Sequence, residues 1–352
     1  MHSCFRNIGA KLLFRSGAPL NASNFRDRLA TAPIIGRLVK KITVDIKDLG
    51  SSLDGPFSAV VECLACLDEL TLIYDKDDAQ ARPELVKSLC RLGSITTLRV
   101  EEAGLDMTKV PAFDEEARSC HFVDYMLNSL LSSGSMSIRS FAHLGSTSLH
   151  STVFHNLRTQ PTHLRTLVLR SSIQYGLRER FNEPTRWSSA ATLEELVIRA
   201  CSGTHYATIA LHVTSGVFGN LRRLVIIGSG YIDDNLSALP RPRISIRVLD
   251  LLEIDHATDW EVLVLAVIPA REVHLTRVFS HAIVKALTQG GWPGLEIVKV
   301  QNWTEEEDAL IPEFRNACAD RHAQLRVGAI PHGPCICHKE WVTGTDDINI
   351  RH

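Results

Sequence analysis

The chain has 352 residues, of which 45% are hydrophobic and 22% are charged. This is the composition of an ordinary folded protein, and it excludes disorder over most of the chain. Lys plus Arg number 38 and Asp plus Glu number 40, so the net charge of −2 speaks against nucleic acid or an acidic membrane as the partner.

Residues 1–36 are expected to form an N-terminal linker or cap. They lack the apolar core of a secretory signal, but Arg6, Lys11 and Arg15 precede the first acid, Asp27, which leaves a mitochondrial presequence as an alternative. The chain has nine cysteines in no framework spacing, and no apolar run approaches the roughly 18 residues of a membrane span. We therefore expect a cytoplasmic or nuclear protein with reduced thiols.

An L-x-x-L-x-L pattern recurs through residues 37–328. Its copies begin at Val39, Leu67, Ile95, Ile138, Leu164, Leu193, Leu221, Ile246, Ala270, Leu295 and His322. All but one of the steps between them fall within 24–29 residues. Such a period with this signature is typical of a leucine-rich repeat solenoid, in which neighbouring strands bury their alternate residues in one shared core. We predict an α/β curved horseshoe of about 10 or 11 irregular repeats, with parallel strands on the concave face and helical or irregular returns on the convex face.

Five return segments place apolar residues at helical spacing. They span residues 58–67, 83–92, 124–133, 151–160 and 280–291. Pro83 and the Gly290-Gly291 pair are typical helix boundaries. A doubly wound α/β sheet would show the same alternation without the repeated motif, and it is the second candidate fold.

The repeat period breaks once, at an insertion spanning residues 101–137. Its acidic part, 101–116, could gate or extend a binding face, or could be a solvated loop. Residues 172–192 replace an expected return helix, and their aromatic and arginine side chains could contact a partner or pack over the solenoid. Residues 329–352 lack the pattern and are expected to form a C-terminal cap or a disordered tail.

Three features support a family resemblance. They are the irregular period, Cys201 at the turn position after a strand, and residues 11–46, where an LLFRS run is followed by GRLVKKITV at the first repeat. Together they resemble the leucine-rich repeat part of fungal F-box proteins over about residues 8–328. The resemblance implies substrate recognition for a ubiquitin ligase. An F-box would lie upstream of Lys11, so adaptor binding is implied only if an F-box precedes this segment.

The third, fifth and seventh positions of each repeat are expected to face away from the core, because strand side chains alternate. We predict that a protein partner binds this concave face. The candidate residues are Thr166, Val168, Arg170, Glu195, Val197, Arg199, Arg223, Val225, Ile227, Asp250, His274 and Lys299.

The fifth positions Val168, Val197 and Val225 predict an exposed apolar strip flanked by Arg170 and Arg199. Such a strip would supply burial and directional hydrogen bonds to a partner. The alternative is that these valines merely suit a strand and the arginines are solvated. If the strip binds, Val197→Asp with Arg199→Glu should abolish capture of a partner and leave the thermal melt nearly unchanged.

No sequence motif of a nucleophilic, phosphate-binding or dinucleotide-binding enzyme is present. Ser229, Asp233 and His256 could be drawn as a triad, but Ser229 lies at the turn position of a repeat, which already explains it. We therefore expect no catalysis and no cofactor.

Two cysteine pairs are candidate metal ligands. Cys63 and Cys66 lie in an apolar helical pattern and are interpreted as buried small side chains. Cys335 and Cys337, with the adjacent histidine, lack a second ligand pair to complete a zinc site. No metal is expected.

The favoured function is non-catalytic protein recognition through the concave face, as in the substrate-recognition part of an F-box receptor. The alternative is a repeat scaffold unrelated to ubiquitin transfer. An α/β enzyme whose sheet mimics the repeat is the third candidate.

Overall fold

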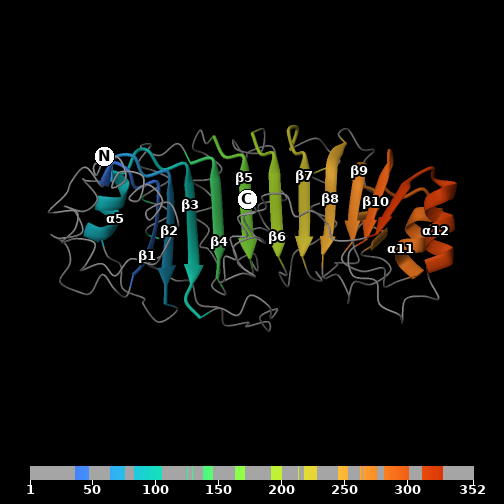
Figure 1. Cartoon of the computed structure of the whole chain (residues 1–352), viewed down its shortest axis with the longest axis horizontal. Helices are drawn as coiled ribbons and strands as arrows, with labels where there is room; N and C mark the ends of the chain where they lie inside the picture. The colour runs from blue at the N-terminus through green and yellow to red at the C-terminus, as the bar shows by residue number, and fades with distance from the viewer. Residues whose placement is uncertain are drawn as a thin grey trace, which may run out of the picture.

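Eleven parallel strands lie side by side in the order in which they occur in the chain (Figure 1). The structure is a computed structural model. It describes residues 36–46, 64–75, 83–104, 125, 129, 138–145, 163–170, 192–199, 213, 218–227, 245–252, 262, 263, 265–275, 281–300 and 311–327. Most of the predicted N-terminal linker, the insertion and the 172–192 stretch lie outside these residues, as does the whole of the predicted tail.

Each predicted copy of the repeat coincides with one strand. The strands are β1 (Lys41–Asp45), β2 (Glu69–Tyr74), β3 (Thr97–Glu102), β4 (Ser140–Leu144), β5 (Thr166–Arg170), β6 (Glu195–Arg199), β7 (Arg223–Ile227), β8 (Ile246–Leu252), β9 (Ala270–Leu275), β10 (Ile297–Val300) and β11 (Gln324–Val327). The strand order follows the chain order without reversal, whereas a doubly wound sheet reverses its order at a switch point. The predicted parallel-strand solenoid is confirmed, and the doubly wound alternative is wrong.

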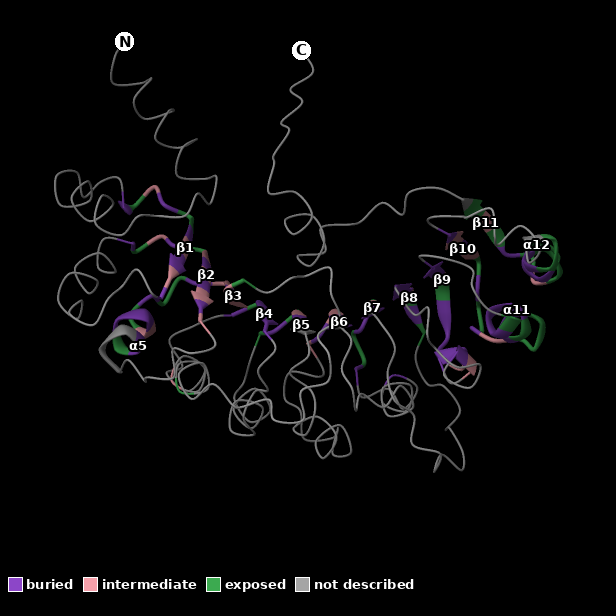
Figure 2. Ribbon diagram, turned by 90° about the horizontal axis from the view of Figure 1, so that it is seen from below, coloured by how far each residue is buried: buried purple, intermediate pink, exposed green. Residues whose placement is uncertain are grey.

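Three helices of the described segments flank the ends of the sheet. They are α5 (Pro83–Cys90), α11 (His281–Thr288) and α12 (Ile311–Asp320), and all lie on the convex side of the curved sheet (Figure 2). The first two confirm the predicted returns at 83–92 and 280–291. The predicted helix at 58–67 ends in a turn at its last four residues, and nearly all of the returns at 124–133 and 151–160 lies outside the described residues.

Helix α12 is a return segment that the repeat pattern did not predict. Its Phe314, Ala317 and Cys318 are buried, and their spacing of three and four residues places them on one helix face. The helical spacing of apolar residues is present in the sequence, but it rests on only these three residues in a helix of ten.

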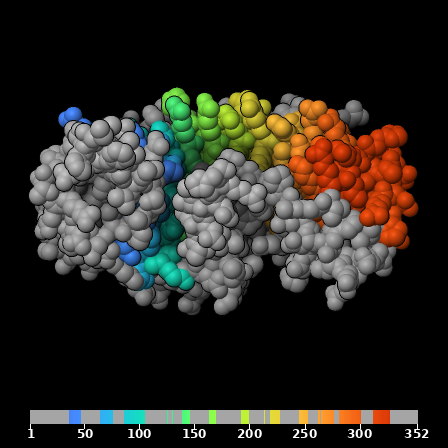
Figure 3. Space-filling view, in the orientation of Figure 1, coloured from blue at the N-terminus to red at the C-terminus, as the bar shows by residue number. Residues whose placement is uncertain are grey.

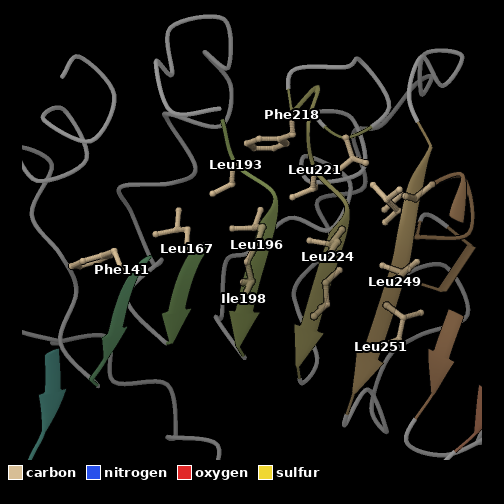
Figure 4. Packing of buried hydrophobic residues seen from close by; sticks show 14 of the residues in the cluster. Phe141, Leu167, Leu193, Leu196, Ile198, Phe218, Leu221, Leu224, Leu249 and Leu251 are labelled. Atoms are coloured by element: carbon tan, nitrogen blue, oxygen red, sulfur yellow. The ribbon is translucent and has the colours of Figure 1, made fainter. Parts of the chain in front are cut away.

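The core lies on the convex side of the sheet, where the first, fourth and sixth positions of the repeat are buried. Figure 4 shows Leu167, Leu196, Leu224 and Leu249 at one level across neighbouring strands, with Phe141 in the same row. Each such side chain contributes about 1.5–3 kcal/mol when it is removed from water. A single repeat cannot bury both of its sides, so stacking is what makes the core.

The last copy of the repeat departs from the pattern. His322, its predicted first position, is exposed and has a left-handed backbone with φ of 56°. The neighbouring Ala323 is buried instead. The assignment of His322 to an apolar position is therefore wrong, because the tight turn between α12 and β11 places the next residue toward the core.

From β1 to β8, a backbone carbonyl at the start of one strand accepts a pair of hydrogen bonds from the next repeat. The carbonyl oxygen of Arg139 accepts from the N–H groups of Arg165 and Thr166, at 2.7 and 3.0 Å. The carbonyl of Arg165 accepts in the same way from Glu194 and Glu195, at 2.8 and 2.9 Å. These bonds fix the register at the edge where the strands begin, so equivalent positions line up in rows.

Candidate protein-binding face

The register aligns all the candidate residues in three rows of alternating positions, and those whose side chains are described lie on the concave face of the sheet. Thr166, Glu195 and Arg223 are aligned in the row of third positions. The row of fifth positions holds Val168, Val197, Val225, Asp250, His274 and Lys299, and the row of seventh positions holds Arg170, Arg199 and Ile227. The alignment predicted from the repeat is therefore correct.

The apolar strip of Val168, Val197 and Val225 is buried, with exposed fractions of 3%, 1% and 1%. It belongs to a second apolar cluster that also includes Ala142, Leu144 and Leu252. The expectation of an exposed strip is wrong. Alternation along a strand determines which face a side chain is on, but it does not determine whether solvent reaches that face.

The flanking positions of the strip are described only in part. The backbones of Arg170, Arg199 and Ile227 pair in register, while their side chains lie outside the described residues. The predicted arginine flank therefore stays a prediction.

Beside the strip, six polar side chains from β6 to β10 form a connected set, which we call the charged network: Glu195, Arg223, Asp250, His274, Glu272 and Lys299. Arg223 Nε donates to Asp250 Oδ2 at 2.7 Å, and its Nη1 lies 3.4 Å from Glu195 Oε1. Arg223 therefore joins β6 to β8. Five of these residues were predicted candidates, and Glu272, a third-position residue, completes the set.

His274 continues the network from β8 to β9. Its Nδ1 lies 2.5 Å from Asp250 Oδ1, in a bent contact that lacks the alignment of a hydrogen bond. Its Nε2 is 3.4 Å from Glu272 Oε2, which also accepts from Lys299 Nζ at 3.0 Å. The side chains of Asp250 and His274 are 1% and 6% exposed. Burying a carboxylate is costly unless it is paired, and here two basic side chains surround it.

The environment shifts the pKa values of the carboxyl groups in the network in opposite directions. Burial raises the pKa of Glu195, and nearby Arg223 only partly opposes this effect. Burial would also raise the pKa of Asp250, but His274 and Arg223 outweigh it and the pKa lies below its usual value. The pKa of Glu272 is likewise lowered, since Lys299 and His274 outweigh its burial. Asp250 and Glu272 are therefore held as anions near neutral pH.

A second polar feature lies within the core, where sequence reasoning missed it. His143 occupies the sixth position of the repeat in β4, where other copies have an aliphatic residue. It is fully buried, and its Nε2 is 3.4 Å from the hydroxyl oxygen of buried Tyr74, with the two rings stacked at a centroid distance of 6.4 Å. Burial lowers the pKa of His143 to about 4. The signal in the sequence was the polar residue at an apolar repeat position.

The Tyr74 hydroxyl lies directly over the backbone of Gly145. A Cβ atom added at Gly145 would collide with that oxygen. A residue without a side chain is therefore required just after β4, which gives the polar pair its room in the core.

The catalytic and metal-binding alternatives are mostly untested by the structure. Ser229, Asp233 and His256 lie outside the described residues, as do Cys63 and the CxCH tail. Within the described ranges, no group of three His, Cys, Asp or Glu side chains is arranged to hold a metal ion. The described helices include none with the length and apolar character of a membrane span.

Neither a family model nor a curated protein matches the chain when the two are compared with it.

Proposed function

We propose that this chain is a non-catalytic leucine-rich repeat protein that recognises another protein through the concave face of its sheet. The observation that supports the proposal most is the unbroken register of eleven parallel strands. It aligns side chains from distant parts of the chain into continuous rows on one face. Repeat proteins use such extended concave surfaces for binding.

The proposed contact surface differs along the sheet. The apolar strip in the middle is buried, so a partner would meet the regions on either side of it. Toward β1 these are partly exposed side chains such as Thr71 and Glu69, and Lys41 forms an ion pair with Glu69 at 2.6 Å. Toward β10 the partly exposed Lys299 marks the end of the charged network. Charged groups of this kind favour specificity and association rate.

The proposal extends to ubiquitin transfer by the family resemblance alone. In that form the chain would supply substrate recognition, and adaptor binding would require an F-box upstream. Co-purification of an F-box-containing longer chain with the cullin adaptor would support this form. A longer chain without adaptor binding would leave a repeat scaffold unrelated to ubiquitin transfer.

Site-specific photo-crosslinking tests the binding face without disturbing buried residues. A benzophenone amino acid is placed at Thr71 or at Lys299 on the concave face, and at exposed Lys285 of α11 as the matched convex control. The expected result is one protein crosslinked from both concave positions, which then binds the purified chain in reconstitution. Crosslinking of that protein from Lys285 alone would contradict the proposal.

Val197→Asp is not a test of binding, although the sequence pattern suggested it. Because Val197 is 1% exposed, an aspartate there would place an unpaired charge in a buried site and lower the stability of the fold.

A further inference from the structure

Arginines line the edge at which the central strands begin. The second position of the repeat holds Arg139, Arg165, Arg222, Arg247 and Arg271, which we call the arginine edge. Between β4 and β9 only Glu194 interrupts this row. The whole chain has a net charge of −2. Within the row five arginines stand against one carboxylate, but Glu272 and Glu296 lie beside Arg247 and Arg271, at 3.9 and 2.8 Å. The local excess of positive charge therefore lies at Arg139, Arg165 and Arg222. Figure 3 shows the beginnings of these strands along the upper rim of the molecule, in green to orange.

The backbone places these side chains at regular intervals. The carbonyl groups of Arg139, Arg165 and Arg222 each accept two N–H groups from the next repeat, so the row follows the strand spacing. That spacing is about 4.8 Å in a parallel sheet, and the row from β4 to β9 therefore runs for roughly 24 Å. An extended peptide of about seven residues has the same length.

Folding does not account for all of these charges. Arg271 is paired, with its Nη2 2.8 Å from Glu296 Oε1. Arg165 is 60% exposed, and its Nη1 lies 3.6 Å from Glu194 Oε1, too far for a direct hydrogen bond. The side chains of Arg139 and Arg222 are exposed and have no hydrogen-bond or ion-pair partner in the part of the chain that the structure describes.

A hollow of about 430 Å³ opens between the starts of β4 and β7. It is lined by Arg139, His163, Arg165, Thr192, Glu194 and Asn220. The volume is within the range of about 300–1,000 Å³ usual for small-molecule sites, so it has room for a side chain and the adjoining backbone. Guanidinium groups match the planar geometry of a carboxylate, and Glu194 is an acceptor for a neighbouring N–H.

We infer that the arginine edge is a second binding site, which takes an acidic extended segment of a partner protein with one Asp or Glu carboxylate in the hollow between Arg139 and Arg165. The site is distinct from the concave face and does not depend on the proposed function. A peptide fits better than a nucleic acid, because a peptide can offer an N–H or hydroxyl group to Glu194 where a phosphate backbone offers only acceptors, and the imidazole of His163 is the one ring in the lining on which a base could stack.

Fluorescence anisotropy of the full chain with a labelled peptide of about eight residues, alternating Glu and Ser, tests the inference at low salt. Arg139→Glu should weaken binding about tenfold, because it replaces a charge-assisted pair with repulsion. The matched reversal Lys285→Glu, at an exposed position on α11, should change it by less than about twofold. Glu194→Gln should strengthen binding by about twofold or more, a gain that misfolding cannot imitate.

Two results would overturn the inference. The first is equal binding by the Arg139→Glu and Lys285→Glu variants. The second is tighter binding of a labelled oligouridylate than of the acidic peptide, with the same loss in Arg139→Glu, which would assign the edge to a nucleic acid. Thermal melts accompany the titrations, and the melt of Arg139→Glu should match the unaltered chain because Arg139 is exposed.

Discussion

The two faces of the sheet follow different rules, as the adjacent residues Leu196 and Val197 show. Both are 1% exposed, but Leu196 points into the core shared by all the repeats and Val197 points to the concave face. The core row is apolar in nearly every strand, whereas the row of Val197 changes from valine in β5–β7 to Asp250 in β8 and His274 in β9. Core positions must fit one continuous apolar layer, while concave positions need only suit their neighbours on adjacent strands.

The largest effect is expected on the core face. Leu196→Ala should lower the free energy of unfolding by about 3 kcal/mol, since it removes buried methyl groups and leaves a cavity between three strands. Urea unfolding followed by circular dichroism measures the loss. The partly exposed Thr71→Ala is the control, with a loss expected below about 0.5 kcal/mol. Equal losses in the two variants would contradict a continuous core.

His143 is the polar exception on the core face, and it predicts a dependence of stability on pH. Its pKa of about 4 in the folded chain is lower than the usual histidine value of 6.5, so the unfolded chain binds a proton first as the pH falls. The stabilisation is complete above pH 6.5 and is lost between pH 6.5 and 4, by about 3 kcal/mol.

The variant His143→Leu isolates this contribution. It places the usual aliphatic residue at the sixth position and should remove the part of the pH dependence that belongs to His143. Asp250 and Glu272, whose pKa values are lowered, lose stability in acid in both chains. The difference between the two unfolding curves from pH 7 to 4 is therefore the measurement, and parallel curves would show that His143 is not buried as a neutral group.

Substitutions in the charged network test whether ion pairs between strands of the concave face stabilise the fold. Asp250→Asn should cost about 2 kcal/mol, because Arg223 and His274 lose a buried anionic partner. In a double-mutant cycle with Arg223→Gln, the coupling energy should be about 1–2 kcal/mol. Urea midpoints of the four chains give this value. Strict additivity would mean that the Arg223–Asp250 contact contributes nothing beyond its separate parts.

The smallest expected effect is at Val197, in the buried apolar strip of the concave face. Val197→Ala should cost about 1–1.5 kcal/mol, as expected for two buried methyl groups on the concave face. This is about half the loss expected for Leu196→Ala. A loss below about 0.3 kcal/mol in a thermal or urea melt would place Val197 in solvent and restore the exposed strip that the sequence pattern predicts.

Sequence reasoning located the strands better than the returns. The apolar spacing of each copy identified β1 to β11, even in the weak copy at Ile138, because each strand places two or three residues in the same core. The apolar pattern did not predict helix α12, because few of its residues are buried. His322 was misplaced because a left-handed turn precedes β11, and no apolar pattern encodes that backbone conformation.

For the candidate site, the sequence predicted which residues share a face but not their environment. Glu195, Asp250 and His274 were identified from alternation alone. Their connection through Arg223 and Glu272 depends on the register between β6 and β10. Alternation also could not show that Val197 is buried, since solvent exposure depends on atoms far away in the chain.

The sequence by itself determined the repeat period, the parallel order of the strands and the division of each strand into core and concave positions. These follow from local spacing, which any stacked copy must satisfy to bury its apolar side chains. Only the tertiary structure decided which concave residues are buried, which charges pair across strands and which arginines are left without a partner. Those properties depend on distances of a few ångströms between residues one repeat apart, and no spacing within a single repeat contains them.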